Sequence, residues 1–361
     1  MEEEEKGEVK CQEKSSLEIL IEKMDRELIA RTAQTPGVNP FEFEDGEGTP
    51  ERNAVMEQVK ELYDTAPPLN NTLSHISTRD LAKILAIKTR ELNKHRGIWG
   101  RDSRVDYYEI TDEQIKKNAR CTAAICRKGS LIDTKNGFST LKVKNYGKSF
   151  NLCDCELFHH QPISAGRMYS GFLVKEDIIA TAGHCADEKN VTDLRFVFGY
   201  KMSDVSTPVT GIPNENIYRG VKLIRRTYDR GSGSDWALVQ LDRRVVGQEV
   251  ATLSEREISP DRPVYIIGYP VGLPSKYSPG ASVSGICGAY FSADLNVYCS
   301  SSGSPVFDSE THEVIGIVVR GDNRDFRLVG NCWTSIIYSR TGKCTKEPQC
   351  TRVSEFIEYC R

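Results

Sequence analysis

The sequence predicts an all-β barrel or sandwich that follows a helical N-terminal region. From about residue 105 onward, short β-type runs alternate with Gly, Pro, Asn and Asp, and no helices of comparable length separate them. Before that point, apolar residues recur at helical spacing between irregular polar segments. We therefore expect a helical region of unknown role over residues 1–104 and a β-rich domain over residues 105–361.

Three amphipathic helices are expected in the N-terminal region. Ser15 and Glu18 form a capping box before the first helix, Pro50 lies at the start of the second, and the third begins at Ser77 or Thr78. Amphipathic stripes do not distinguish an adaptor, a pro-segment and a spacer. A protein partner or a regulatory role for these helices therefore stays open.

The expected strands are short apolar runs bounded by turn residues. Many such runs at roughly even spacing favour a barrel or sandwich over a parallel sheet. The clearest runs are Gly171–Val174, Ile178–Ala180, Leu194–Phe198, Trp236–Leu241, Val264–Ile267 and Val314–Val319.

Composition excludes several classes of protein. The 361 residues include 48 Lys and Arg against 51 Asp and Glu, so no strong field would attract nucleic acid or an anionic membrane. No run approaches the roughly 18 apolar residues that cross a bilayer. The acidic start, Met1–Lys6, lacks the basic and apolar regions of a secretory signal. We expect a cytoplasmic protein that binds neither nucleic acid nor membrane.

Three segments carry residues suited to nucleophilic catalysis. A serine hydroxyl is a poor nucleophile at neutral pH, so it needs a base within reach and a carboxylate that orients this base. The chain order His, Asp, Ser and the absence of Gly-X-Ser-X-Gly argue against a lipase or esterase. The segments are Ala180–Cys185 with His184, Ser234–Leu241 with Asp235, and Tyr298–Phe307 with Ser302.

These segments resemble the trypsin-like serine peptidases. The ending Ser302–Phe307 is most similar to the bacterial-type, glutamyl-endopeptidase-like branch, and Ile267–Pro270, Gly316–Gly321 and Thr351–Phe356 extend the resemblance over roughly residues 115–361. The resemblance implies two antiparallel six-stranded barrels with the site between them. It also implies a serine endopeptidase whose substrate is a polypeptide.

The resemblance assigns a role to each site residue. His184 is the general base and acid, Asp235 is the carboxylate that orients it, and Ser302 is the nucleophile. The backbone N–H groups of Ser300 and Ser302 would form the oxyanion hole. The reaction implied is peptide-bond hydrolysis through an acyl-enzyme intermediate.

Two positions depart from the family pattern. Related enzymes usually carry Gly at the position of Ser300, where a Cβ hinders the backbone conformation of an oxyanion hole. A protease-shaped binding module without catalysis is therefore the alternative function. Ser301 has no charge to pair with a freed N-terminal ammonium, so activation by such an ion pair is not expected.

The resemblance also places a specificity pocket. Its floor falls at Asn296, where no acid is present to favour Lys or Arg, and Val318 replaces the His of glutamyl endopeptidases. Arg320 would favour acidic side chains if it pointed inward. Cleavage preference therefore stays open. The pocket residues are Asn296, Val318, Val319, Arg320 and Gly321.

The cysteine pattern indicates thiols more than metal ligands. The strand before Cys185 offers it no partner, so Cys185 is expected to be free. Cys153–Cys155 with His159 and His160 match no common tetrahedral zinc spacing, so we expect no metal and no cofactor. Four cysteines near the C-terminus could pair in an oxidising environment: Cys332, Cys344, Cys350 and Cys360.

Overall fold

The computed structural model describes residues 98–99, 102–229, 231–321, 325–329, 331–337 and 347–361. The three predicted N-terminal helices lie outside these ranges. Within them, the α-helices are short: α4 (Glu113–Arg120) and α5 (Tyr146–Phe150). No helix in these ranges is long and apolar enough to cross a bilayer.

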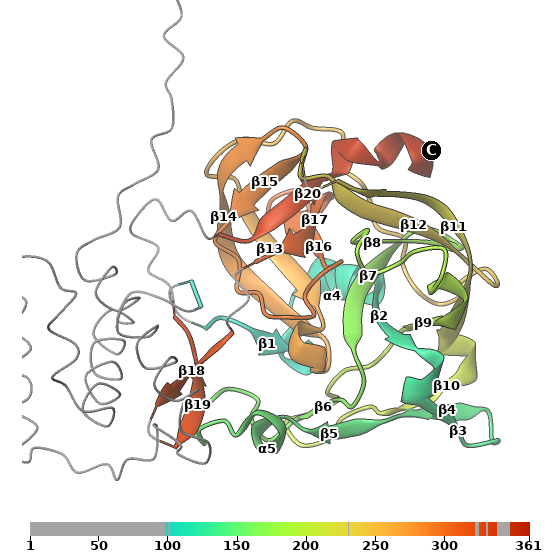
Figure 1. Cartoon of the computed structure of the whole chain (residues 1–361), viewed down its shortest axis with the longest axis vertical. Helices are drawn as coiled ribbons and strands as arrows, with labels where there is room; N and C mark the ends of the chain where they lie inside the picture. Colours follow the sequence, from blue (N-terminus) through green and yellow to red (C-terminus); the bar gives the residue numbers. More distant parts are fainter. Residues whose placement is uncertain (1–97, 100–101, 230, 322–324, 330, 338–346) are drawn as a thin grey trace, which may run out of the picture. The chain divides into compact units, whose positions relative to one another are not determined.

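The first barrel is a closed ring of antiparallel strands in the order β11-β12-β8-β7-β2-β9 (Figure 1). It closes because β9 pairs with both β2 and β11. The strands are β2 (Thr122–Arg127), β7 (Met168–Lys175), β8 (Ile178–Thr181), β9 (Leu194–Val197), β11 (Ile217–Tyr228) and β12 (Asp235–Leu241).

The second barrel follows the order β14-β13-β16-β17-β20-β15, and the pairing of β15 with β14 closes it. A further short strand, β1 (Val105–Asp106), pairs with the outer edge of β14. The predicted pair of six-stranded antiparallel barrels is confirmed. The strands are β13 (Pro263–Gly268), β14 (Lys276–Cys287), β15 (Tyr290–Ala293), β16 (Pro305–Asp308), β17 (Val314–Arg320) and β20 (Gln349–Arg352).

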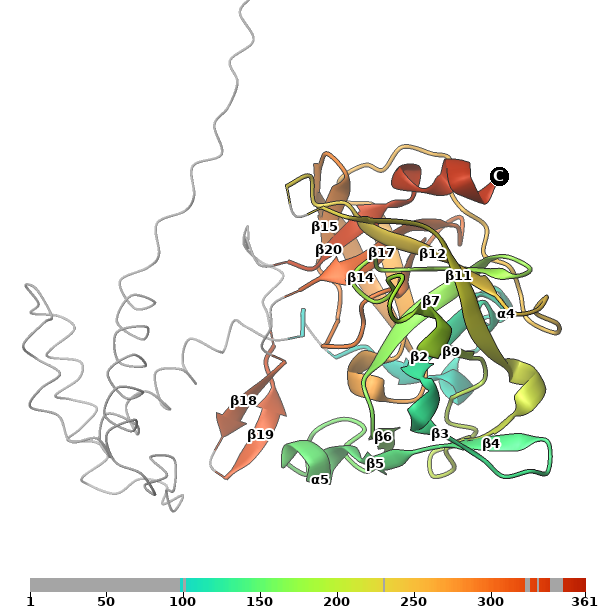
Figure 2. The same ribbon diagram turned by 45° about the vertical axis from the view of Figure 1, so that its right-hand side comes forward.

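Smaller elements surround the barrels (Figure 2). Three small sheets are formed by β3 (Leu131–Asp133), β4 (Phe138–Leu141) and β10 (Gly211–Pro213), by β5 (Val143–Asn145) and β6 (Pro162–Ser164), and by β18 (Phe326–Val329) and β19 (Cys332–Ser335). The 3₁₀ turns are η3 (Tyr107–Glu109), η4 (Lys128–Ser130), η5 (Val191–Asp193), η6 (Asn214–Asn216), η7 (Pro270–Gly272), η8 (Val353–Glu355) and η9 (Ile357–Cys360).

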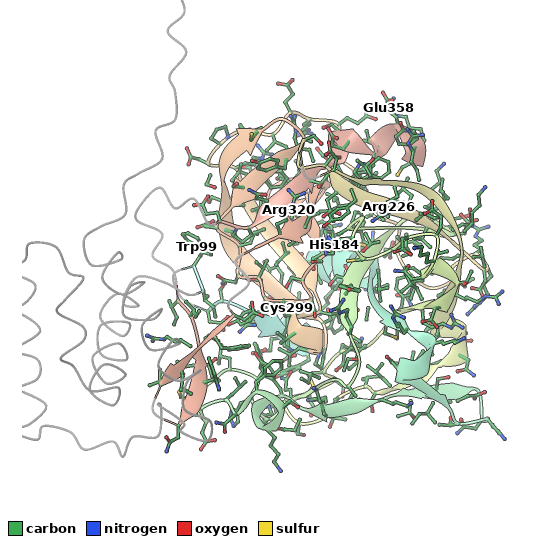
Figure 3. All side chains as sticks on the ribbon, in the orientation of Figure 1. Trp99, His184, Arg226, Cys299, Arg320 and Glu358 are labelled. Atoms are coloured by element: carbon green, nitrogen blue, oxygen red, sulfur yellow. The ribbon has the colours of Figure 1, made fainter. Side chains whose placement is uncertain are left out.

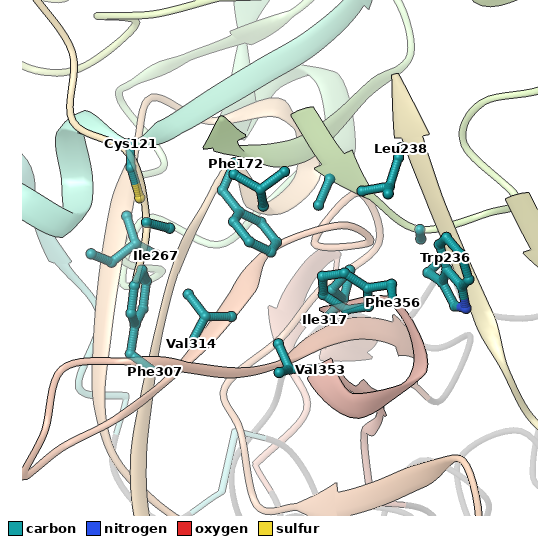
Figure 4. Packing of buried hydrophobic residues seen from close by; sticks show 14 of the residues in the cluster. Cys121, Phe172, Trp236, Leu238, Ile267, Phe307, Val314, Ile317, Val353 and Phe356 are labelled. Carbon is teal, nitrogen blue, oxygen red and sulfur yellow. The ribbon is translucent and has the colours of Figure 1, made fainter. Parts of the chain in front are cut away.

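Alternate residues of one strand enter different cores. Ile179 of β8 packs inside the first barrel, whereas its neighbour Ala180 packs in a layer shared by both barrels. In β13, Ile266 packs inside the second barrel and Ile267 joins the shared layer, which Figure 4 shows. Because both faces of these strands are buried, they appear in the sequence as continuous apolar runs. The shared layer joins the two barrels into one packed body.

The segment before residue 105 packs against the second barrel. Ile98 and Trp99 are buried, and the Trp99 N–H donates a hydrogen bond to Asn296 Oδ1 at 2.9 Å. Residues 96–327 and 333–361 form one compact unit. We therefore propose that the β-rich domain begins near Arg96, earlier than the boundary at residue 105 that the sequence suggests.

The described cysteines are mostly thiols. Cys185 is free, as expected, and Cys350 and Cys360 are also free. Cys153 and Cys332 are disulfide-bonded. Among the described cysteines, only these two are disulfide-bonded, and the others are free thiols.

Burial should control the reactivity of these thiols. Burial raises the pKa of Cys121 and Cys126 to about 12, so neither forms thiolate at pH 8. We expect iodoacetamide to alkylate the exposed Cys155, Cys287 and Cys299 in the folded protein and to spare these two, as measured by peptide mass spectrometry. Alkylation of all sites in urea is the control. Equal rates of alkylation at buried and exposed cysteines of the folded protein would contradict this expectation.

Candidate active site

His184 lies just beyond the end of β8, near the centre of the view in Figure 3. The chain turns there through Gly183, where an added Cβ would lie 2.2 Å from the Thr227 carbonyl oxygen. Only glycine therefore lets this turn approach β11 so closely. The His184 backbone N–H then donates to Asp235 Oδ1 at 3.0 Å.

Asp235 begins β12 and has a side chain that is only 1% exposed. Its Oδ2 lies 2.9 Å from His184 Nδ1. The hydroxyl of Thr351, in β20, accepts the Asp235 N–H and donates to the Asp235 carbonyl, both at 3.1 Å. With Nδ1–H donated to the carboxylate, the imidazole keeps Nε2 as its proton acceptor.

Ser302 lies in the turn before β16, which packs against the first barrel. The Ser302 carbonyl accepts the N–H of Ser170 in β7 at 2.9 Å. A Cβ on Gly303 would lie 1.9 Å from the Ser170 carbonyl oxygen and 2.3 Å from Thr181 Oγ1, at the end of β8. Ser302 is half-buried, and its hydroxyl has no hydrogen-bond partner among the described residues.

Ser300 adopts the left-handed conformation, with φ of 74°. This conformation usually belongs to glycine and costs another residue about 1–2 kcal/mol. The Cys299 carbonyl accepts the Val271 N–H at 2.7 Å, so the Ser300 N–H of the same trans peptide points away from Val271. In the described part of the chain, the N–H groups of Ser300 and Ser302 have no hydrogen-bond partner. The Cβ of Ser300 therefore does not prevent this backbone conformation.

Residues 169–317 match the family model of the trypsin-like peptidase domain. Over these residues the chain is similar to the trypsin-like peptidase family. The matched residues include His184, Asp235 and Ser302 and run from β7 into β17. No curated protein matches the chain.

Solved structures similar to this chain include three proteases or protease relatives. A Glu endopeptidase is 14% identical, with a TM-score of 0.41 over 73% of this chain and 98% of its own. The VesB protease of Vibrio cholerae is 14% identical, with a TM-score of 0.44 over 72% and 66%. The scabies mite inactivated protease paralogue S-D1 is 10% identical, with a TM-score of 0.42 over 72% and 94%.

The predicted pocket residues do not all face one space. Asn296 is buried and bound to the chain's own upstream segment: its Oδ1 accepts the Trp99 N–H, and its Nδ2 donates to Ser103 Oγ at 3.1 Å. Val318 packs inside the second barrel and Val319 in the layer shared by the barrels. Among the described residues, an added Cβ on Gly321 would meet Val297 Cγ2, at 3.5 Å.

Arg320 is neither fully solvated nor paired with a carboxylate in the described ranges. Its Nη1 donates to Gln349 Oε1 at 3.3 Å, and its Nη2 is buried without a hydrogen-bond partner there. An ideal Cβ on Gly233, just before β12, would lie 3.3 Å from Nη1. The guanidinium therefore lies between β20 and the segment that leads to Asp235.

Several neighbours of His184 could not be identified from the sequence. The rings of Tyr169 and Tyr228 lie 6.3 and 6.2 Å from the imidazole, and Arg226 Nε donates to the Gly183 carbonyl at 2.5 Å. These residues come from β7 and β11 and show no local motif. No group of three or more His, Cys, Asp or Glu side chains in the described ranges suits a metal ion.

Proposed function

We propose that this chain is a serine endopeptidase that hydrolyses peptide bonds through an acyl-enzyme intermediate. The observation that carries the proposal is the buried Asp235 carboxylate, which bonds both the ring and the backbone of His184. The turn that holds Ser302 packs against the strand that leads to this histidine. A peptidase domain implies polypeptide substrates.

The proposed acylation begins with attack by Ser302 Oγ on the carbonyl carbon of the scissile peptide. His184 Nε2 takes the hydroxyl proton, and the Asp235 carboxylate stabilises the imidazolium that forms. The C–N bond then breaks as His184 returns this proton to the leaving amine. Water, deprotonated by the same imidazole, hydrolyses the ester and restores the serine hydroxyl.

The proposed oxyanion hole consists of the N–H groups of Ser300 and Ser302. The free state of both groups and the left-handed Ser300 backbone support this role. Such donors stabilise charge that develops only in the transition state, and loss of one typically costs about 2.7–4 kcal/mol. The alternative, a binding module on the same fold, is favoured only by the unpartnered Ser302 hydroxyl.

A fluorophosphonate probe tests the proposal, because it phosphonylates only an activated serine. We expect the full-length protein to be labelled at Ser302, as located by peptide mass spectrometry. Ser302→Ala should abolish the label, and Ser309→Ala, in the turn after β16, should keep it. Absence of labelling in the folded chain, both intact and after limited proteolysis, would favour the binding module and refute the peptidase.

A further inference from the structure

A buried ion pair lies in the segment that precedes β1. The Arg104 side chain is 1% exposed and its partner Asp102 is 14% exposed. Arg104 Nε and Nη2 donate to the two Asp102 carboxylate oxygens at 2.9 and 2.7 Å, so the ion pair is bidentate. Burying a guanidinium is costly even when it is paired. What this guanidinium contacts therefore indicates its role.

The guanidinium of Arg104 stacks on the buried ring of Tyr298. Its carbon lies 4.2 Å from the ring centroid, within the range of a cation–π contact. Arg104 Nη2 also donates to the Tyr298 hydroxyl at 3.3 Å, and this hydroxyl donates to Ser335 Oγ at 2.6 Å. Arg104 therefore contacts both the ring face and the hydroxyl of Tyr298.

Tyr298 in turn begins the turn that carries the nucleophile. Its carbonyl accepts the Ser301 N–H at 3.0 Å, and its N–H donates to Ser301 Oγ at 3.1 Å. Ser301 lies between the two residues whose N–H groups form the proposed oxyanion hole. A shift of Tyr298 would therefore move both of these N–H groups.

The same segment holds this loop at a second point. The Trp99 N–H and Ser103 Oγ both bond to the side chain of Asn296, two residues before Tyr298. Trp99, Ser103 and Arg104 thus contact two side chains of the loop of residues 296–302. We call residues 296–302 the nucleophile loop.

We propose that Arg104, with Asp102 as its partner, is a positioning residue that holds the nucleophile loop in its oxyanion-binding geometry. This inference rests on the proposed function. Because the oxyanion exists only in the transition state and the intermediates, loss of this geometry should lower kcat and leave KM nearly unchanged. A merely structural role would not separate the two constants.

The test compares full-length Arg104→Met with Arg243→Met. Arg243 is a matched control because its guanidinium stacks 4.1 Å from the Tyr218 ring, in the first barrel. On a peptide substrate, Arg104→Met should lower kcat by about 10²-fold, the lower range for loss of an oxyanion donor. Arg243→Met should retain the wild-type kcat. If Arg104→Met fails to fold, Asp102→Asn provides the same test. It removes no side-chain volume and should also lower kcat.

Amide hydrogen exchange gives a readout that does not need activity. Exchange within residues 296–304 should be faster in Arg104→Met than in the wild type and unchanged in Arg243→Met. An unchanged kcat together with unchanged exchange, or an increase in KM alone, would overturn the proposal. A wild-type protein that neither cleaves nor takes up the probe would refute the proposed function, and the exchange data would still decide whether Arg104 holds the loop.

Discussion

Replacing Asp235 with asparagine should lower kcat by about 10⁴-fold while the fold stays intact. An asparagine amide at this position would donate a hydrogen bond to His184 Nδ1, which now lies 2.9 Å from Oδ2. The ring proton would then move to Nε2, the atom that must accept the serine proton. The size of the effect follows from this wrong tautomer and from the loss of the charge that stabilises the imidazolium.

Asp242→Asn is the matched control for this variant. Asp242 follows β12 at its other end, and its Oδ1 accepts the Arg219 N–H at 2.9 Å, outside the candidate site. Steady-state hydrolysis of a peptide substrate should show the wild-type rate for Asp242→Asn. If instead Asp242→Asn lost activity and Asp235→Asn kept it, the assignment of the orienting carboxylate would be wrong.

Gly303→Ala should abolish activity and lower the free energy of unfolding by about 3–5 kcal/mol. The new Cβ would lie 1.9 Å from the Ser170 carbonyl oxygen, and the residue has a φ of 86°. The clash involves backbone, which cannot rotate away as a side chain can. The turn must therefore separate from β7, and Ser302 must move with it.

Urea unfolding and fluorophosphonate labelling measure the two effects of this substitution. Gly285→Ala, in β14 of the same barrel, is the control because no atom of the described residues lies within 4 Å of its added Cβ. We expect Gly285→Ala to unfold within about 1 kcal/mol of the wild type and to be labelled normally. Normal labelling of Gly303→Ala would contradict the packing described for the nucleophile turn.

The strands of the barrels were predictable because burial on both faces makes them continuous apolar runs. Each of the six predicted runs forms a strand; β9, for example, ends at Val197, one residue before the predicted end at Phe198. β1 was not predictable, since two residues carry no period and its pairing with β14 spans about half the chain. The contacts of Arg104 were hidden for the same reason, because Tyr298 is 194 residues away.

The site was predicted in part. The proximity of His184 and Asp235 followed from the motif around each residue, although 51 residues separate them. The sequence also indicated strain at Ser300, which the structure places at positive φ. It did not indicate that Asn296 is bound to Trp99 and Ser103, because that contact depends on where the upstream segment packs.

The order of the strands has a consequence for biosynthesis. Thr351 belongs to β20, the final strand of the second barrel, yet it bonds the backbone of Asp235 in the first. A ribosome therefore releases His184 and Asp235 long before it releases β20, the strand whose Thr351 bonds the Asp235 backbone. A nascent or prematurely terminated polypeptide that lacks β20 would lack this support of Asp235, so under the proposed function it should be inactive.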